Sequence, residues 1–153
     1  MCLNNCKKIK AKKEGIKCYK FLVARPGSEC YSSPYWSKEW HEGETLTAYS
    51  DKESFSKDFL YSISGGAFHA FANYEDAFDN AAFYYWAWFF KTVNSHMKVY
   101  VCECTIPSDS EYIFIGETGD AKCYASQKLR IDKVIREIME KDVVKYGEKI
   151  NKQ

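Results

Sequence analysis

The sequence predicts an α+β fold, in which a mixed or mainly antiparallel sheet packs against a long aromatic helix and a C-terminal amphipathic helix. Three observations lead to this prediction. Apolar residues occupy both faces of segments 97–106 and 111–116, as in strands that are buried on both sides. Residues 73–93 begin with helix-start signals and continue into seven aromatic residues within 81–90. From Asp132 onward, apolar residues recur at helical spacing.

The length and the charge distribution predict one domain with a basic extension. The chain has 153 residues, of which 46% are hydrophobic and 28% are charged, and a chain of this size buries a core without a metal or a disulfide. Residues 1–20 carry seven lysines and one glutamate, whereas the net charge of the whole chain is +1. We therefore expect a basic N-terminal arm over residues 1–14 and a single α+β domain over residues 15–150.

In the first half of the domain, the sequence predicts short elements separated by turns. Residues 16–24 (IKCYKFLVA) are rich in strand-forming types, and residues 25–36 carry Pro-Gly and Ser-Pro turn markers typical of a loop. Residues 40–49 predict a turn at Gly43 and then a short strand, and residues 50–60 predict a short helix.

A short strand within 65–71 (GGAFHAF) precedes the long helix that we predict over 73–93. Asn73 is a suitable N-cap residue, and acidic residues follow it in the first turn. One face of the helix is an apolar stripe, which consists of Phe78, Ala81, Ala82, Tyr85 and Phe89. Further aromatic residues extend the apolar surface around the cylinder, so we expect the sheet to cover one side and the C-terminal helix or the loop 25–40 to cover another.

In the C-terminal third, the sequence predicts a hairpin, a loop and a helix. Residues 97–106 and 111–116 should pair as two central antiparallel strands around the turn PSDS. We expect ETGDAKCYAS to be a loop and QKLRI to be a short strand or an extended segment. Asp132 should cap the C-terminal helix, and Gly147 should end it.

Seven cysteines and the lack of a targeting segment predict a cytoplasmic protein. The cysteine count is odd, and the N-terminus MCLNNCKKIKAKK lacks the apolar core of a signal peptide. The aromatic run of 81–90 would be about 15 Å long as a helix, which is half of a bilayer. We therefore expect free thiols and no contact with a membrane.

The sequence contains no pattern that points to catalysis or to metal binding. Its close cysteine pairs are Cys2/Cys6 and Cys102/Cys104, and they lack the spacing of the paired doublets of a zinc site. None of the three histidines lies in a nucleophile motif, and no glycine-rich phosphate loop is present. We assign no catalytic residue, no metal ligand and no cofactor.

The aromatic run and the basic arm are the candidate contacts with a partner. Aromatic stripes on helices are usually core, but an exposed part would bind a partner, because Trp and Tyr anchor interfaces. The lysines could contact RNA phosphates or form a solvated terminus. The candidate contact residues are Trp86, Trp88 and Phe90, together with Lys7, Lys8, Lys10, Lys12 and Lys13. A sheet face that stacks RNA bases is a further possibility, with Tyr19, Tyr100, Tyr112 and Phe114 as its rings.

Several segments within residues 16–131 resemble a group of small bacterial proteins found in phage and mobile-element contexts. They are CYKFLV, SPYW with a later GE, GGAFHAFANYEDA, VYVCECTIPSDSEYIFIGE and YASQKLRI. Proteins of this size from such contexts are often inhibitors of bacterial defence, anti-CRISPR proteins among them. The resemblance implies a non-catalytic inhibitor that engages a host protein or ribonucleoprotein, such as a Cas protein or its guide RNA.

A fainter resemblance is to ADP-ribosyltransferase-like folds, which use NAD. An early strand, a Gly-x-His turn, an aromatic helix and the pattern V-x-x-C-x-I-P carry it. This resemblance implies a ligand site at His69, Tyr84 or Tyr85, and Glu111 or Glu117, in an enzyme or a degenerate relative. The alternative for His69 is a core histidine that bonds a backbone carbonyl.

Overall fold

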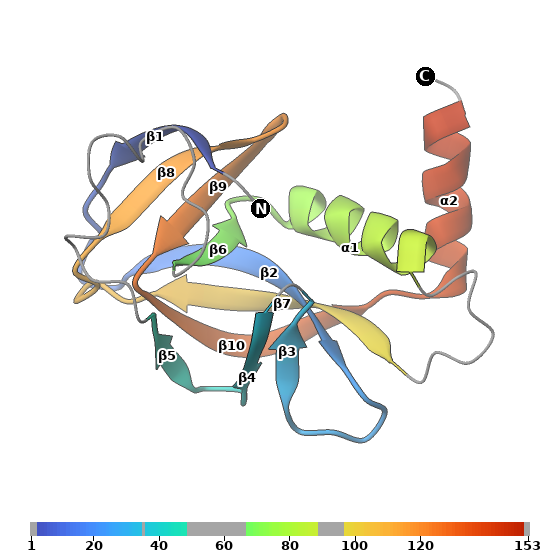
Figure 1. Cartoon of the computed structure of the whole chain (residues 1–153), viewed down its shortest axis with the longest axis horizontal. Helices are drawn as coiled ribbons and strands as arrows, with labels where there is room; N and C mark the ends of the chain where they lie inside the picture. Colours follow the sequence, from blue (N-terminus) through green and yellow to red (C-terminus); the bar gives the residue numbers. More distant parts are fainter. Residues whose placement is uncertain (1–2, 35, 49–66, 89–96, 152–153) are drawn as a thin grey trace.

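A computed structural model of the chain describes residues 3–34, 36–48, 67–88 and 97–151. Within these ranges, a mainly antiparallel ten-stranded sheet packs against a helix that carries the aromatic residues, so the predicted α+β fold is confirmed (Figure 1). The strands are β1 (Asn4–Lys8), β2 (Ile16–Ala24), β3 (Tyr31–Ser33), β4 (Trp36–Trp40), β5 (Thr45–Thr47), β6 (Phe68–Phe71), β7 (Lys98–Ile106), β8 (Ile113–Thr118), β9 (Ala121–Ser126) and β10 (Lys128–Glu137). The helices are α1 (Tyr74–Trp88) and α2 (Glu140–Asn151). The short helix expected over 50–60 and the last turn of the long helix lie outside the described residues.

The sheet is built around β2 and β7. Its strand order is β1-β8-β9-β6-β2-β7-β10-β5, and β3 joins β2 and pairs in turn with β4. Strands β2 and β7 are antiparallel over their full lengths, from the pair Ile16–Ile106 to the pair Ala24–Lys98. The prediction that 97–106 is a central strand is therefore confirmed, as is the strand over 16–24.

The predicted hairpin between 97–106 and 111–116 is wrong. Strand β7 pairs with β2 and β10, whereas β8 pairs with β9 and β1. The segment ETGDAKCYAS, which we expected to be a loop, completes β8 and forms β9 around a tight turn. Gly119 has a φ of 59° in this turn, and a Gly-Asp pair is a known signal for a two-residue hairpin.

The predicted start of the C-terminal helix at Asp132 is also wrong. Residues 128–137 form β10, and α2 begins only at Glu140 and continues past Gly147. The pairing of β10 with β7 shifts register twice, between Ile131 and Lys133 and between Val134 and Arg136. Such bulges interrupt the two-residue alternation of a strand, which left apolar residues at the spacing of a helix.

The segment that we expected to be a basic arm contributes a strand to the sheet. Residues Asn4–Lys8 form β1 and pair with β8, with Lys8 opposite Phe114. Leu3, immediately before β1, is fully buried in the core. The lysines of this segment nevertheless remain exposed, and they are Lys7, Lys8, Lys10, Lys12 and Lys13.

The two faces of the sheet bury different cores. On one face, residues of β2 and β7 such as Phe21 and Val101 pack against α1. On the other face, Trp40 and Phe68 pack with residues from β2, β7 and β10, among them Cys104. Trp40 and Phe68 meet edge to face, with ring centroids 5.4 Å apart. Neither helix in the described part of the chain combines the length and the apolar character needed to cross a bilayer.

Candidate functional site

Helix α1 begins where the sequence predicted and lies close to the sheet through small residues. Asn73 precedes the helix, its backbone carbonyl accepts the Ala77 N–H at 3.3 Å, and its side-chain amide contacts the Asp76 carboxylate at 3.3 Å. Ala77, Ala81 and Ala82 are fully buried. Alanines at the contact bring the helix backbone close to β2, so that larger side chains of α1 lie beside the contact and at its margins.

The last two turns of α1 carry an aromatic surface that is only partly covered. We define this α1 surface as Phe83, Tyr84, Trp86 and Trp88. The side chains of Phe83 and Trp88 are 47% and 63% exposed. The rings form two neighbouring pairs, Phe83–Trp86 with centroids 6.0 Å apart and Tyr84–Trp88 with centroids 6.4 Å apart. Tyr84 also contacts Phe21 of β2 at 5.6 Å, so the surface is anchored to the core.

A cavity adjoins α1 near the start of α2. Its volume is about 470 Å³, and its lining combines apolar side chains, such as Tyr85, Met97 and Met139, with the charged residues Lys98, Glu137 and Glu140. Met139 is 45% exposed. Helix α2 stands beside the C-terminal end of α1 in Figure 1. Exposed aromatic and methionine side chains thus occur together at this end of the molecule, and such side chains are enriched in interfaces.

The structure separates the two groups of predicted partner contacts. Trp86 and Trp88 lie on α1, whereas the lysines lie on β1 and on the connection from β1 to β2. In Figure 1, β1 is at the opposite side of the molecule from the C-terminal turn of α1. The aromatic and basic residues therefore do not form one continuous surface. Phe90, the third aromatic candidate, lies outside the described residues.

The three residues of the predicted NAD site are not brought together. His69 on β6 lines a cavity beside β2, and Tyr85 on α1 lines the cavity next to α2. Glu117 on β8 lines a third cavity with Lys7 of β1. The three residues thus line three different cavities, and no specific observation among the described residues favours the NAD-using alternative. The RNA-stacking sheet face loses two of its four predicted rings, because Tyr112 and Phe114 are 1% and 8% exposed, whereas Tyr19 and Tyr100 are partly exposed.

The structure brings together a cysteine and a histidine that the sequence analysis did not connect. Cys30 Sγ lies 3.4 Å from His41 Nε2 and 3.8 Å from Nδ1. The two residues flank the β3–β4 pair, in which Tyr31 lies opposite Trp40. We had assigned residues 25–36 to a loop and so missed this hairpin.

The Cys30–His41 pair lacks the geometry of a catalytic dyad. A nucleophile needs one ring nitrogen on the thiol and an acid orienting the other. Here both ring nitrogens lie near the same sulfur. The nearby Glu44 carboxylate accepts the backbone N–H of His41 at 2.9 Å instead of a ring N–H. In the part of the chain that the structure describes, no group of three or more His, Cys, Asp or Glu side chains could hold a metal ion.

Comparison with known proteins adds no relative: no family model, curated protein or solved structure matches the chain.

Proposed function

We propose that this chain is a binding protein without catalysis, and that it docks a host protein on the α1 surface. The observation that carries this proposal is the exposure of Trp88 and Phe83 in rings that neighbouring rings hold in place. An indole that is already positioned loses little conformational entropy on binding, which is why Trp is enriched among the residues that dominate interface energies. The adjoining cavity with Met139 offers a recess for an apolar side chain of the partner.

The charges around α1 favour a protein partner over RNA. Helix α1 contains Glu75, Asp76 and Asp79 and no lysine or arginine. Two cations at the neighbouring ends of β7 and β10 are paired with acids: Lys98 lies 3.0 Å from Glu137, and Arg136 lies 2.7 Å from Asp142. An RNA phosphate would therefore meet negative or neutralised groups, whereas RNA-binding aromatic surfaces carry basic residues alongside.

The resemblance to mobile-element proteins suggests the class of partner. It supports a role as an inhibitor of a host defence system, in the manner of an anti-CRISPR protein, with a Cas protein as the first candidate target. Contact with the guide RNA would use the exposed lysines of β1 and the following connection, on a separate surface. The two contacts should then be separable by mutation.

The Trp88→Ala variant should lose most of its binding to the host target. Truncating a central interface tryptophan costs about 2 kcal/mol or more, which is a roughly 30-fold weaker affinity. The test is a pull-down from lysate of a host strain, followed by titration of the captured protein. Glu75→Ala, at the other end of the same helix, is the matched control and should bind as the wild type does. Equal capture by wild type and Trp88→Ala would contradict the proposal.

Nuclease treatment and the basic residues distinguish a protein target from an RNA target. Capture through the α1 surface should survive nuclease, and it should survive the double charge reversal Lys12→Glu/Lys13→Glu. A guide-RNA contact would instead appear as a component that nuclease removes, that these reversals weaken and that falls steeply with salt. Release of all captured protein by nuclease would show that the α1 surface is not the main contact.

A further inference from the structure

The sheet opens along one edge of β2. On one side, β2 pairs with β7 over its full length. On its other side, it pairs with β6 at Tyr19–Phe71 and with β3 at Val23–Ser32, as far as the described residues show. Lys20, which lies between these two contacts, faces a cavity of about 340 Å³. This volume is at the lower end of the range for small-molecule sites.

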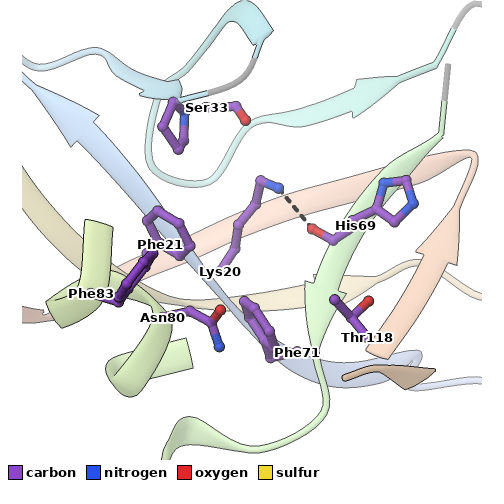
Figure 2. A pocket seen from close by; sticks show the side chains of 9 residues that line it. Lys20, Phe21, Ser33, His69, Phe71, Asn80, Phe83 and Thr118 are labelled. Atoms are coloured by element: carbon purple, nitrogen blue, oxygen red, sulfur yellow. Dashed lines mark hydrogen bonds between the residues drawn. The ribbon is translucent and has the colours of Figure 1, made fainter. Parts of the chain in front are cut away.

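Aromatic walls and a few polar groups line this cavity. Phe21 of β2, Phe71 of β6 and Phe83 of α1 supply rings, and Asn80 of α1 supplies an amide. Figure 2 shows Phe83 beside Phe21 and the side chain of Lys20 extending from β2 toward β6. The side-chain N–H of Asn80 is held by the Asp76 carbonyl at 2.8 Å. Flat apolar walls with a small number of positioned polar groups are typical of ligand sites.

Lys20 is a part-buried amine without an acidic partner in the part of the chain that the structure describes. Its Nζ donates one hydrogen bond, to the backbone carbonyl of His69 at 2.7 Å (Figure 2). Among the described residues, none that lines the cavity is acidic, and Lys20 is in none of the ion pairs. An ammonium group has three N–H donors, and the bond to His69 uses one of them. Burial lowers the pKa of Lys20 because the charged amine is poorly solvated there.

The described groups that act electrostatically on this amine are thiols, and they are neutral. Cys18 of β2, Cys102 and Cys104 of β7 and Cys123 of β9 are its electrostatic neighbours. Burial raises the pKa of each of these thiols, to about 12 for Cys102 and about 11 for Cys123. They therefore supply no negative charge at neutral pH, and no acidic group among the described residues forms an ion pair with Lys20.

We propose that this cavity binds a small aromatic carboxylate. The carboxylate would accept N–H groups of Lys20 beside the bond to His69, and the ring would lie among the three phenylalanines. An anion at this point compensates the positive charge of Lys20, and a charge-assisted hydrogen bond is stronger than one between neutral groups. A cationic ligand would repel Lys20, and an aliphatic hydrocarbon would leave its donors unpaired. A neutral hydrogen-bond acceptor would pair with a donor but would bring no negative charge.

The two proposals are tested through different residues, so each can fail alone. Phe83 belongs to both, and for that reason the test leaves it unchanged. The probe is 3-phenylpropanoate, titrated by calorimetry and by ligand-observed NMR. Its uncharged analogue 3-phenylpropanamide has the same ring and nearly the same shape. The protein variants are Lys20→Met, which removes the charge, and Lys17→Met, an exposed control on the same strand.

The wild-type chain should bind 3-phenylpropanoate with a Kd of about 1 mM or lower, as expected for a ligand of this size. Lys20→Met should weaken this affinity by about 10- to 100-fold, which corresponds to the loss of a hydrogen bond to a charged group. Lys17→Met should not change it, and the amide should bind the wild type as weakly as the acid binds Lys20→Met. Equal binding of the acid and the amide, or of the acid by wild type and Lys20→Met, would overturn the proposal.

The same carboxylate chemistry could come from a metabolite or from the C-terminus of a peptide. N-acetyl-Gly-Gly-Phe with a free carboxylate therefore serves as a second probe beside the free acid. Binding of either probe that depends on Lys20 supports the site, and the tighter one identifies the source. Failure of the wild-type chain to bind either probe overturns it. The affinity should also fall as the pH rises through the lowered pKa of Lys20, and Lys20→Met should lack this pH dependence.

Discussion

Replacing Lys20 with methionine should make the protein more stable. The variant keeps the length of the side chain and removes a positive charge that has one hydrogen bond and no acidic partner among the described residues. Replacing buried ionic groups with apolar ones of similar volume stabilises proteins by up to about 1–4 kcal/mol. In a chain of this length, each kcal/mol raises Tm by roughly 2–4 °C. Calorimetry of the wild type and the variant measures the difference directly.

The matched control and the pH dependence show whether the charge is the cause. Lys17→Met, in which a 62% exposed lysine loses its contact with Glu103, should change stability by no more than about 0.5 kcal/mol. The folded-state pKa of Lys20 lies below its unfolded value of about 10.4. Between these two pKa values the unfolded chain binds more protons, so wild-type stability rises with pH. The advantage of Lys20→Met should therefore shrink as the pH rises, and an advantage that is absent at pH 7, or independent of pH, would contradict this assignment.

Gly116→Ala should displace β1 from the sheet. A Cβ at position 116 would lie 2.5 Å from the backbone oxygen of Asn4 and 2.8 Å from Cγ of Leu3. The Asn4 backbone would have to move away from this Cβ, and that movement would break the β1–β8 pairing. Losing the burial of Leu3 alone should cost about 1.5–3 kcal/mol. Urea unfolding measures this cost, and trypsin should begin to cut the native variant at Lys7 and Lys8.

Gly27→Ala is the control that separates this steric clash from the free-energy cost of placing alanine at a positive φ. Gly27 has a φ of 77° and open space around its Cα, so alanine there should cost about 1–2 kcal/mol through its conformation alone. It should leave the first ten residues as resistant to trypsin as they are in the wild type. If Gly116→Ala were equally resistant, β1 would not depend on the close approach that we describe.

The elements that the sequence predicted well are those whose signal is local. Residues 16–24 are dense in strand-forming types, and Asn73 with the acids after it fixes the start of α1. The errors arose where the fold depends on distant partners. Periodicity identifies 97–106 as a central strand but does not say that its neighbours are β2 and β10. In β10, two shifts of register mimic the periodicity of a helix, so only the pairing with β7 reveals a strand.

The candidate sites were predictable to a similar extent. The aromatic run identified Trp88 as a possible contact, and the structure shows that α1 leaves it exposed because buried alanines make the contact with the sheet. Lys20 carried no comparable signal. Within IKCYKFLVA it reads as one polar residue in a strand. Its position at a cavity arises because β3 and β6 pair with different parts of the same edge of β2, and the sequence does not show this arrangement.

Oxidative footprinting of the free protein and of its complex with the captured host target tests the central claim most directly. Hydroxyl radicals should oxidise Trp88 readily in the free protein, while the fully buried Trp40 remains unmodified and serves as the internal reference. In the complex, we predict that Trp88 and Phe83 become protected from oxidation. Tyr19 of β2, which lies near the other end of α1, should keep its level of oxidation. Undiminished oxidation of Trp88 and Phe83 in the complex would contradict the account, because the partner would then be bound elsewhere.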